Sequence, residues 1–482
     1  MIQINKFPIQ IHPSAKRTLI RPFIPGTPNH VEHVLFRIFS TPKDKIRHYL
    51  NQIYEKLDEE DDRLKQIFIK HYENVRHRIP SNVSLSQDEK EFIGSFFTQQ
   101  YALESTALFN PSIVPHPIQD KEGVLKFIVS LRAIGEGHIS SILFMEGEID
   151  LSFNFTLSAD KSTLIYEPER IEPDYEKKLF IKKANELDIL SDLNKAVFDL
   201  LSEDFSYNEL EDAINKVKRA NIANNINFLE ESLNKIRLLA LSNFSLRFNT
   251  PNIADRAIFP ASPSQSNGLE DARFVKFIND DGSFIYYATF TAYDGRTIMP
   301  EMLETYDFKE FKISTLNGPH AKNKGMALFP RKVNGNYMMI GRQDNESLYI
   351  MTSENPYFWY DSCPLIKPTY SWEYIQIGNC GSPIEIDEGW LVITHGVGPI
   401  RTYSLGCILL DKNEPWRVLG RLEEPLIQAS KEESTGYVPN VVYTCGALAI
   451  GRTILLPYAV GDIVTKFCLI SIDELLKEMK QP

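Results

Sequence analysis

The sequence is short of the features that mark secreted and membrane-bound proteins. Only five of its 482 residues are cysteines; they are widely spaced and form no C-x-x-C pair: Cys363, Cys380, Cys407, Cys445 and Cys468. The N-terminus also lacks a basic stretch followed by a long apolar one, so no secretory signal is expected. We therefore predict reduced core thiols and a cytoplasmic protein. No apolar run approaches the length of a membrane span, so no membrane partner is expected.

Basic residues are in deficit as well. The 52 lysines and arginines are outnumbered by 64 aspartates and glutamates, giving a formal net charge of −12. This balance argues against a nucleic-acid partner, which requires a basic face, but it is compatible with a local basic pocket for a small anion. Histidines and acids show no spacing typical of metal ligands, so we predict no metal and no other cofactor.

The periodicity of the apolar residues divides the chain into helical and β-rich parts. Residues 1–106 are predicted to be largely helical, and Ser86–Glu89 has the pattern of a capping box at the start of one helix. Residues 107–170 alternate as strands do, residues 171–242 return to helical spacing, and residues 243–482 are again rich in short strands. A mainly β fold with an N-terminal helical region and an inserted helical segment follows.

The β-rich parts show an internal repeat. Its units begin near Ala107, Gly268, Gly325, Gly381 and Gly436, and the last four starts lie about 55 residues apart. Each unit opens with polar or small residues and continues as two to four short strands divided by turns. Five units predict a five-bladed β-propeller, whose central channel gathers one inner strand or loop from each blade. A β-sandwich with insertions is the competing architecture.

Two adjacent carboxylates, Glu270 and Asp271, stand out in the run from Asn267 to Val275. Successive side chains of a strand point to opposite faces, so only one of the two acids is expected to face a shared cavity. The other is expected to turn toward a structural partner. Arg273, two places from Asp271, lies on the same face of the strand and can orient that acid. Taken alone, the run also fits an acidic turn that closes a hairpin.

Polar residues recur at the entries and turns of the five units. In chain order they are Asn110, Arg132, His138, Arg273, Tyr293, Asp294, Lys324, Arg342, Asp344, His395, Arg401, Tyr403 and Asp462. On a propeller such positions lie where the blades meet the axis, so these side chains are expected to share one pocket. Several of these residues also fit a purely structural role. Arg342 can pair with Asp344, and His395 can be a hydrogen-bonded core histidine. Tyr293 and Tyr403 fit strand aromatics, Asp294 fits a turn residue, and Asp462 fits the end of a strand.

Several longer motifs are distinctive in order and spacing. They are Gly268-Leu269-Glu270-Asp271-Ala272-Arg273, Lys324 to Pro330, Trp390 to Gly396, Leu409-Leu410-Asp411 and Val438-Pro439-Asn440-Val441-Val442. Together they resemble glycoside hydrolase family 130, the β-mannoside phosphorylases and related β-mannosidases. The likeness runs over about Ala107 to Leu157 and Asn243 to Leu476, so the remaining helical parts indicate a longer subgroup.

The resemblance implies a five-bladed propeller and an inverting enzyme with one catalytic carboxylate, Asp271. Lys324 and His395 fall at positions that the family associates with phosphate, and Arg401 is the third expected phosphate ligand. The family's hydrolases carry acidic residues in that region. The expected substrate-binding residues are Asn110, Arg132, His138, Arg273, Tyr293, Asp294, Arg342, Asp344, Tyr403 and Asp462.

The chemistry agrees with this implication. Inverting hydrolysis needs a base to activate water, whereas phosphate is already an anionic nucleophile and needs a cationic cradle instead. The predicted reaction is phosphorolysis of β-1,2- or β-1,4-linked manno-oligosaccharides to α-mannose 1-phosphate, with inorganic phosphate as co-substrate. A β-mannoside hydrolase is the alternative within the family, and a non-catalytic glycan-binding propeller is the alternative of another class. A homo-oligomer is left open.

Overall fold

The computed structural model describes residues 2–57, 62–158, 162–187, 189–220 and 226–481; the side chains of residues 226–229 are not described. The chain forms two compact units. The smaller takes in Lys16–Ala102 and Thr163–Glu167, and the larger takes in the rest of the chain.

The smaller unit is mostly helical. Its helices are α1 (Pro28–Phe39), α2 (Lys43–Leu57), α3 (Asp62–Arg76) and α4 (Gln87–Phe96). They pack around a core that includes Leu50, Leu64 and Phe68. At the start of α4 the Ser86 hydroxyl accepts from the Glu89 amide while the Glu89 carboxylate accepts from the Ser86 amide, so the predicted capping box is confirmed.

Three strands form a small sheet in the order β3 (Thr98–Glu104), β2 (Ser14–Pro22) and β8 (Leu164–Tyr166). The first strand of the chain does not join it. β1 (Ile4–Ile11) pairs antiparallel with β30 (Val464–Ser471), close to the C-terminus. The beginning of the chain is therefore β-structure, in contrast to the helical region predicted for residues 1–106, because a pairing between residues more than 450 positions apart leaves no local pattern.

The larger unit consists mainly of antiparallel sheet. One sheet holds β1, β30, β29 (Thr453–Val460), β27 (Val442–Tyr443) and β28 (Leu448–Ile450). A second holds β22 (Gln376–Asn379), β23 (Ile384–Ile386), β24 (Gly389–Val397), β25 (Tyr403–Leu410) and β26 (Val418–Arg421). A third holds β18 (Ala327–Leu328), β19 (Tyr337–Gly341), β20 (Leu348–Ser353) and β21 (Asp361–Ile366).

The largest sheet divides into two antiparallel groups. The first contains β4 (Ala107–Pro115), β5 (Val124–Ile134), β6 (Ser140–Asp150), β7 (Phe155–Leu157) and β13 (Ala257–Ile258). The second contains β14 (Gly268–Ile278), β15 (Phe284–Tyr293), β16 (Ile298–Thr305), β17 (Glu310–Thr315), β12 (Phe244–Arg247) and β9 (Glu169–Ile171). One parallel residue pair, Gly268 with Ser140, joins them. Among its described residues the larger unit thus has five antiparallel groups of four or more strands.

One segment from each of the five groups contributes residues to two different cavities. The segments are residues 110–115, 270–278, 324–331, 378–385 and 438–449. The first part of each contributes to a polar cavity, and the last part contributes to a largely apolar one. The five segments therefore run together between the same two ends, which places the first residues of each around one space.

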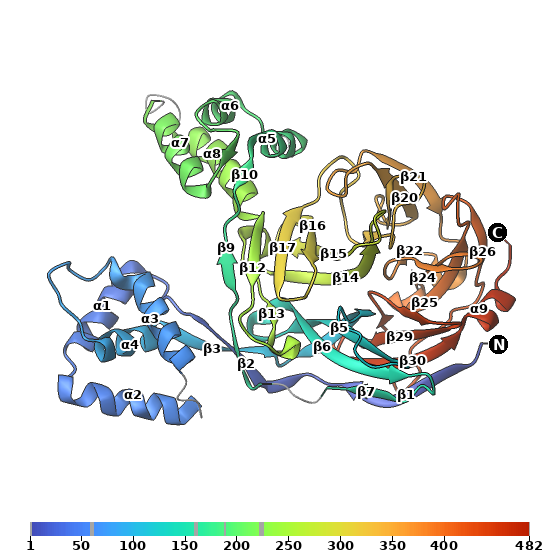
Figure 1. Ribbon diagram of the computed structural model, residues 1–482, viewed down its shortest axis with the longest axis horizontal. Coiled ribbons are helices and arrows are strands. Elements are labelled where there is room, and N and C mark those ends of the chain that lie inside the picture. The colour runs from blue at the N-terminus through green and yellow to red at the C-terminus, as the bar shows by residue number, and fades with distance from the viewer. Residues whose placement is uncertain (1, 58–61, 159–161, 188, 221–225, 482) are drawn as a thin grey trace. The chain divides into compact units, whose positions relative to one another are not determined.

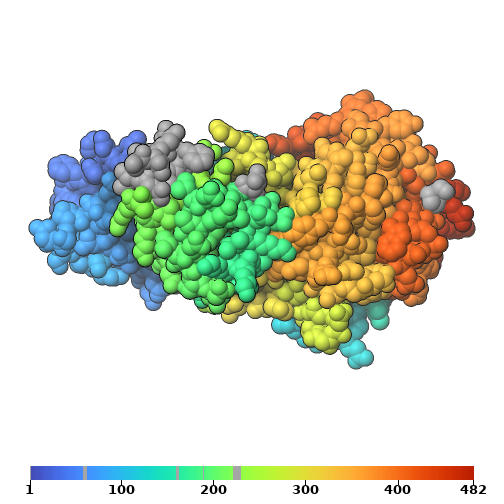
Figure 2. Space-filling model, turned by 90° about the horizontal axis from the view of Figure 1, so that it is seen from above, coloured from blue at the N-terminus to red at the C-terminus, as the bar shows by residue number. Residues whose placement is uncertain are grey.

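A compact group of helices interrupts the β-structure. It consists of α5 (Lys177–Glu186), α6 (Asp192–Asp199), α7 (Tyr207–Ala220), α8 (Ile226–Leu241) and the short strands β10 (Tyr175–Glu176) and β11 (Asp204–Phe205). These helices cluster together and pack around their own apolar core (Figure 1). In the space-filling view their atoms form a green surface beside atoms coloured yellow and orange (Figure 2). A last helix, α9 (Ile472–Glu478), follows β30. The predicted mainly β fold is confirmed.

Candidate functional site

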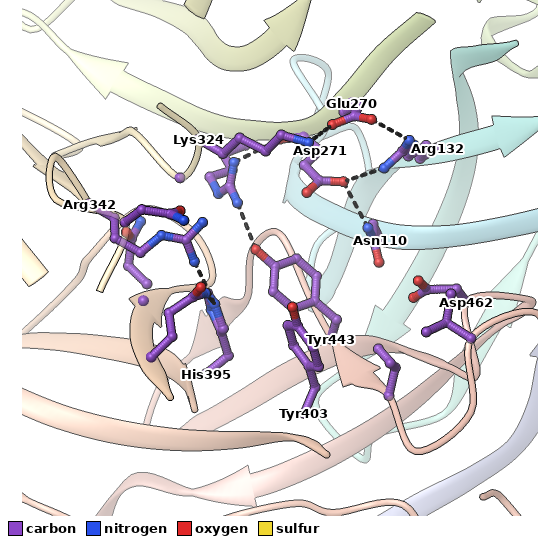
Figure 3. Close-up of a pocket in the computed structure, with 18 of the residues that line it drawn as sticks. Asn110, Arg132, Glu270, Asp271, Lys324, Arg342, His395, Tyr403, Tyr443 and Asp462 are labelled. Atoms are coloured by element: carbon purple, nitrogen blue, oxygen red, sulfur yellow. Dashed lines mark hydrogen bonds and ion pairs between the residues drawn. The ribbon is translucent and has the colours of Figure 1, made fainter. Parts of the chain in front are cut away.

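The first residues of each of the five segments line a polar cavity of about 340 Å³. Its lining includes ten residues that the sequence singled out: Asn110, Arg132, Asp271, Arg273, Lys324, Arg342, His395, Arg401, Tyr403 and Asp462. Figure 3 shows most of these side chains directed into one space. Because they come from all five strand groups, only the folded larger unit brings them together.

The strand β14 carries both acids of the cavity. Its pairing with β15 shifts register between Glu270 and Arg273, and Asp271 adopts a left-handed backbone conformation with φ of +56°. A bulge of this kind breaks the alternation of side chains along a strand. Glu270 and Asp271 consequently both line the cavity, and the prediction that one of them turns away is wrong.

Asp271 is held by two donors. The Nδ2 atom of Asn110 donates to its Oδ1 at 2.7 Å, and Nη1 of Arg132 donates to the same oxygen at 3.3 Å. Burial acts to raise the pKa of the Asp271 carboxyl, but the charges of Arg132 and Arg273 and the Asn110 hydrogen bond outweigh it. They hold this pKa below its usual range, so the carboxyl is ionised near neutral pH.

Glu270 connects two cations. Its Oε1 accepts from Nη2 of Arg132 at 2.8 Å, and its Oε2 forms an ion pair with Nζ of Lys324. A continuous chain of charges therefore runs from Lys324 through Glu270 and Arg132 to Asp271 (Figure 3). Lys324 is the most exposed member, with 36% of its side chain accessible compared with 13% for Glu270.

His395 lines the cavity and is uncharged near neutral pH. Its Nε2 lies 3.3 Å from Nη1 of Arg342 and 3.3 Å from Nε2 of Gln376. Because an arginine only donates, the unprotonated Nε2 must accept, which leaves the proton on Nδ1, 3.7 Å from Sγ of Cys380. Burial, followed by the positive charges of Arg342 and Arg273, lowers the pKa of His395 well below its usual value. His395, one of the three expected phosphate ligands, therefore lines the cavity without adding a positive charge to it.

Two arginines and two tyrosines lie close to His395 in the cavity lining: Arg273, Arg342, Tyr403 and Tyr443. Arg273 donates from Nη2 to the Tyr443 hydroxyl at 2.7 Å and from Nη1 to the backbone carbonyl of Asp271 at 3.1 Å. The rings of His395 and Tyr403 are stacked with centroids 6.0 Å apart, and Tyr443 meets His395 edge-on at 4.9 Å. Burial lowers the pKa of Arg342 from its ordinary value, but an arginine remains charged near neutral pH.

Asp462 and Arg401 line the cavity from turns between strands. Both have left-handed backbone conformations, with φ of +51° and +56°. Burial, reinforced by the negative charge of Asp271, raises the pKa of Asp462 to about 7, against the opposing charges of Arg132 and Arg401. The pKa values of Asp462 and Asp271 are therefore moved in opposite directions.

Four predicted site residues do not line this cavity. Asp294 and Asp344 each accept two backbone amides of the turn that follows them, so their carboxylates stabilise turns. The Tyr293 hydroxyl donates to the carbonyl of Gly295. His138 is exposed and stacks on Tyr437 at 6.2 Å. Their positions give no support to the predicted sugar contacts.

Several lining residues were not predicted as site residues. They are Glu270, Gly325, Asn345, Gln376, Gly378, Asn379, Val438, Val441 and Tyr443. Tyr443 follows directly on the Val438–Val442 motif, so the extension of that motif by one residue is the signal that would have found it. Gln376 and Asn345 stand in no motif that points to the cavity.

The five cysteines differ in their exposure. Four of the five cysteines are buried, but Cys363 is exposed, so the prediction of core thiols is wrong for that residue. Among the described residues no group of histidines, cysteines and acids is placed to hold a metal ion. Within that part of the chain, no helix is both long and apolar enough to cross a membrane.

A family model described as β-1,4-mannooligosaccharide phosphorylase matches residues 231–481, just over half of the chain. The chain belongs to glycoside hydrolase family 130. The match contains four of the five cavity segments, whereas β4 and β5, which supply Asn110 and Arg132, lie before it.

Curated relatives of this family are known enzymes. The chain is 34% identical to the 1,2-β-oligomannan phosphorylase of Thermoanaerobacter sp. (strain X514) over 216 residues, which is 43% of this chain and 70% of the relative. It is 33% identical to the β-1,4-mannooligosaccharide phosphorylase of Ruminococcus albus over 190 residues, 36% of this chain and 56% of the relative. For two β-1,2-mannobiose phosphorylases the match spans 66% and 63% of the relative, so the chain covers less than two thirds of most of these relatives.

Solved structures of the family resemble the larger part of the chain. The β-1,2-mannobiose phosphorylase of Listeria innocua, in complex with β-1,2-mannobiose, is 20% identical with a TM-score of 0.45, over 77% of this chain and 92% of that one. A structure reported for family members that hydrolyse β-1,2 mannosidic linkages is 15% identical with a TM-score of 0.46, over 77% and 86% of the two chains.

Proposed function

We propose that this family 130 member is an inverting β-mannoside phosphorylase whose larger unit is a five-bladed β-propeller. The five antiparallel strand groups are the blades, and residues 110–115, 270–278, 324–331, 378–385 and 438–449 are the inner segments around the channel. The polar cavity lies at one end of that channel, which is where propellers hold their ligands.

The charge of the cavity carries the proposal. Its lining has five cations, Arg132, Arg273, Lys324, Arg342 and Arg401, against three carboxyls, of which Asp462 is partly protonated near neutral pH. The site is therefore positively charged within a chain of net charge −12. A partly buried cluster of arginines and a lysine is a strong binding site for an oxyanion such as phosphate.

The proposed reaction uses these groups as follows. Phosphate held by Lys324 and Arg401 attacks the anomeric carbon of the mannoside, and the C1–O bond to the acceptor sugar breaks. Asp271 gives its proton to the leaving oxygen, directly or through a hydroxyl of the sugar, and the hydroxyl proton of the hydrogenphosphate restores it. The products are α-mannose 1-phosphate and the shortened sugar. Neutral His395 assists by accepting from Arg342 and fixing the direction of that guanidinium.

One observation favours hydrolysis as the second candidate. A hydrolase of inverting mechanism needs a second carboxyl that is a base near neutral pH. Asp462, with its pKa raised to about 7, fits that requirement better than Glu270, which is engaged by two cations. The names of the relatives support phosphorolysis, and the cationic lining favours an anionic nucleophile over water.

Product analysis separates the candidates. The protein is incubated with β-1,2- and β-1,4-mannobiose, with and without phosphate, and free mannose and α-mannose 1-phosphate are quantified. Phosphorolysis predicts mannose 1-phosphate only in the presence of phosphate, in amounts equal to the released acceptor. Mannose released at one rate in both conditions establishes a hydrolase, and the absence of any product with binding retained establishes a glycan-binding protein.

A further inference from the structure

Glu270 occupies an unusual position between the proposed phosphate ligand and the proposed acid. Its two carboxylate oxygens are shared between Lys324 and Arg132, and Arg132 in turn contacts Asp271. The Arg132 contact to Glu270 is 2.8 Å, whereas its contact to Asp271 is 3.3 Å. Arg132 thus already divides its charge unequally, and a small change at Glu270 can alter what remains for Asp271.

The ionised state of Asp271 poses a problem for the proposed reaction. A general acid must carry a proton, but the groups that face Asp271 keep it ionised. The charged and titratable groups around it are Arg132, Glu270, Arg273, Lys324, Arg342, Cys380, His395, Tyr443, Cys445 and Asp462. Cations outnumber anions among them, so proton uptake requires either added negative charge or withdrawal of a cation.

Bound phosphate adds negative charge near Asp271 and also withdraws a cation from it. It brings negative charge to Lys324, the most accessible cation of the chain of charges, and it competes there with the Glu270 carboxylate. Once Glu270 loses Lys324, both of its oxygens are available to the fork of Arg132, a geometry that guanidinium and carboxylate prefer. The longer contact from Arg132 to Asp271 then weakens.

We propose that Glu270 is a positioning residue that couples phosphate binding at Lys324 to protonation of Asp271, by exchanging Lys324 for a fuller ion pair with Arg132. This inference rests on the proposed phosphorylase function. It explains why an acid is placed against the phosphate ligand: the acid delays proton uptake until the nucleophile has arrived.

The coupling has a kinetic signature that a merely structural ion pair lacks. In Glu270→Gln, phosphate meets no competing carboxylate at Lys324, so the KM for phosphate falls by about tenfold, the lower end of what one charge-assisted hydrogen bond is worth. At the same time Arg132 remains wholly on Asp271, so kcat falls by about tenfold or more. Binding improves while turnover worsens.

A matched control is available in the same unit. Glu385 also bridges an arginine and a lysine, contacting Nη2 of Arg331 at 2.7 Å and Nζ of Lys412 at 3.4 Å. It lines the apolar cavity rather than the polar one. Glu385→Gln should leave both kinetic constants within about twofold, the small effect expected for an exposed ion pair.

The experiment measures initial rates against phosphate at saturating mannobiose for wild type, Glu270→Gln and Glu385→Gln. Opposite changes in KM and kcat confined to Glu270→Gln support the coupling. A raised or unchanged phosphate KM in that variant overturns it. If Glu270→Gln does not fold, Glu270→Ala replaces it, because it also removes the carboxylate from both Lys324 and Arg132, and the same opposite changes are expected.

Binding measurements keep this test separate from the proposed function. Calorimetric titration with sulfate, which mimics phosphate without turnover, should give tighter binding to Glu270→Gln than to wild type. Tighter sulfate binding without any phosphate-dependent turnover refutes the phosphorylase proposal and, with it, the role of Glu270 in protonation. Phosphate-dependent turnover with equal sulfate affinities refutes the inference about Glu270 alone.

Discussion

Replacement of Asp271 by asparagine tests the proposed acid while preserving its contacts. Asn110 and Arg132 both donate to a single oxygen of Asp271, Oδ1. An asparagine keeps a carbonyl oxygen at that place, and its amide takes the place of Oδ2, which accepts no hydrogen bond within the described residues. The variant is therefore expected to fold, with a neutral group that cannot deliver a proton.

The expected loss depends on the leaving group. General acid catalysis is typically worth about 10²–10⁴-fold, which corresponds to roughly 2.7–5.4 kcal/mol of barrier. Asp271→Asn should lose this factor on mannobiose, whose leaving sugar needs a proton. It should lose much less on a dinitrophenyl β-mannoside, whose leaving group departs as a stable anion.

A second effect of the same substitution concerns Asp462. Part of the rise in the pKa of Asp462 comes from the negative charge of Asp271. Removing that charge lets Asp462 ionise at lower pH, so its pKa should move from about 7 toward its ordinary value. Proton titration of Asp462 by carboxyl-detected NMR would follow this shift.

The assay compares kcat/KM for the two substrates in wild type and Asp271→Asn, with thermal unfolding as the check on folding. An equal loss on both substrates would mean that Asp271 does not act as the acid. A Glu270→Gln variant that loses the leaving-group-dependent factor, with Asp271→Asn active, would assign the acid to Glu270 instead.

Three further predictions concern other parts of the chain. Lys324→Ala should raise the KM for phosphate by about 10–150-fold, the worth of one charge-assisted hydrogen bond of about 1.5–3 kcal/mol, with a smaller change for the mannoside; equal changes in a two-substrate titration would contradict it. Glu301 is buried and has a pKa raised to about 7 from 4.5, chiefly by burial, so the folded state binds its proton more tightly and the free energy of unfolding falls by roughly 3 kcal/mol as pH rises from 4.5 to 7. Urea unfolding at pH 5 and 8 should show a smaller fall for Glu301→Gln, and an unchanged fall would refute the assignment. In the inserted helices, Glu211→Ala removes the ion pair with Arg237 and should cost less than about 1 kcal/mol of stability, with no change in turnover of an activated mannoside.

The division into helical and β-rich parts was accessible from the sequence because each depends on local periodicity. The apolar spacing around Leu50 and the capping box at Ser86 record contacts within one or two turns of helix. The pairing of β1 with β30 records none, since its hydrogen-bond partners lie at the other end of the chain. Long-range pairing therefore set the limit of the fold prediction.

The site was accessible where a residue type alone implies its chemistry. Arg132, Lys324 and Arg342 are cations in polar motifs of two strand groups, and the fold brings them to one cavity. The charge state of His395 was not accessible, because it follows from burial beside two arginines that are distant in sequence. Asp294 shows the opposite error. Its motif suggested a sugar contact, but its carboxylate accepts hydrogen bonds from backbone amides of its own turn.

The side-chain directions of Glu270 and Asp271 could not be predicted from the regular alternation of side chains along a strand. Five non-glycine residues that line the cavity have positive φ values between 47° and 64°: Asn110, Asp271, Asn345, Arg401 and Asp462. Each departs from the extended backbone on which the alternation of side chains depends, and such conformations carry a cost that the surrounding structure must offset. Their concentration around one cavity, on segments from different strand groups, indicates that the backbone is bent there to aim side chains inward. A sequence pattern that assumes regular strands will misplace side chains at these positions, which are the ones the proposed chemistry uses.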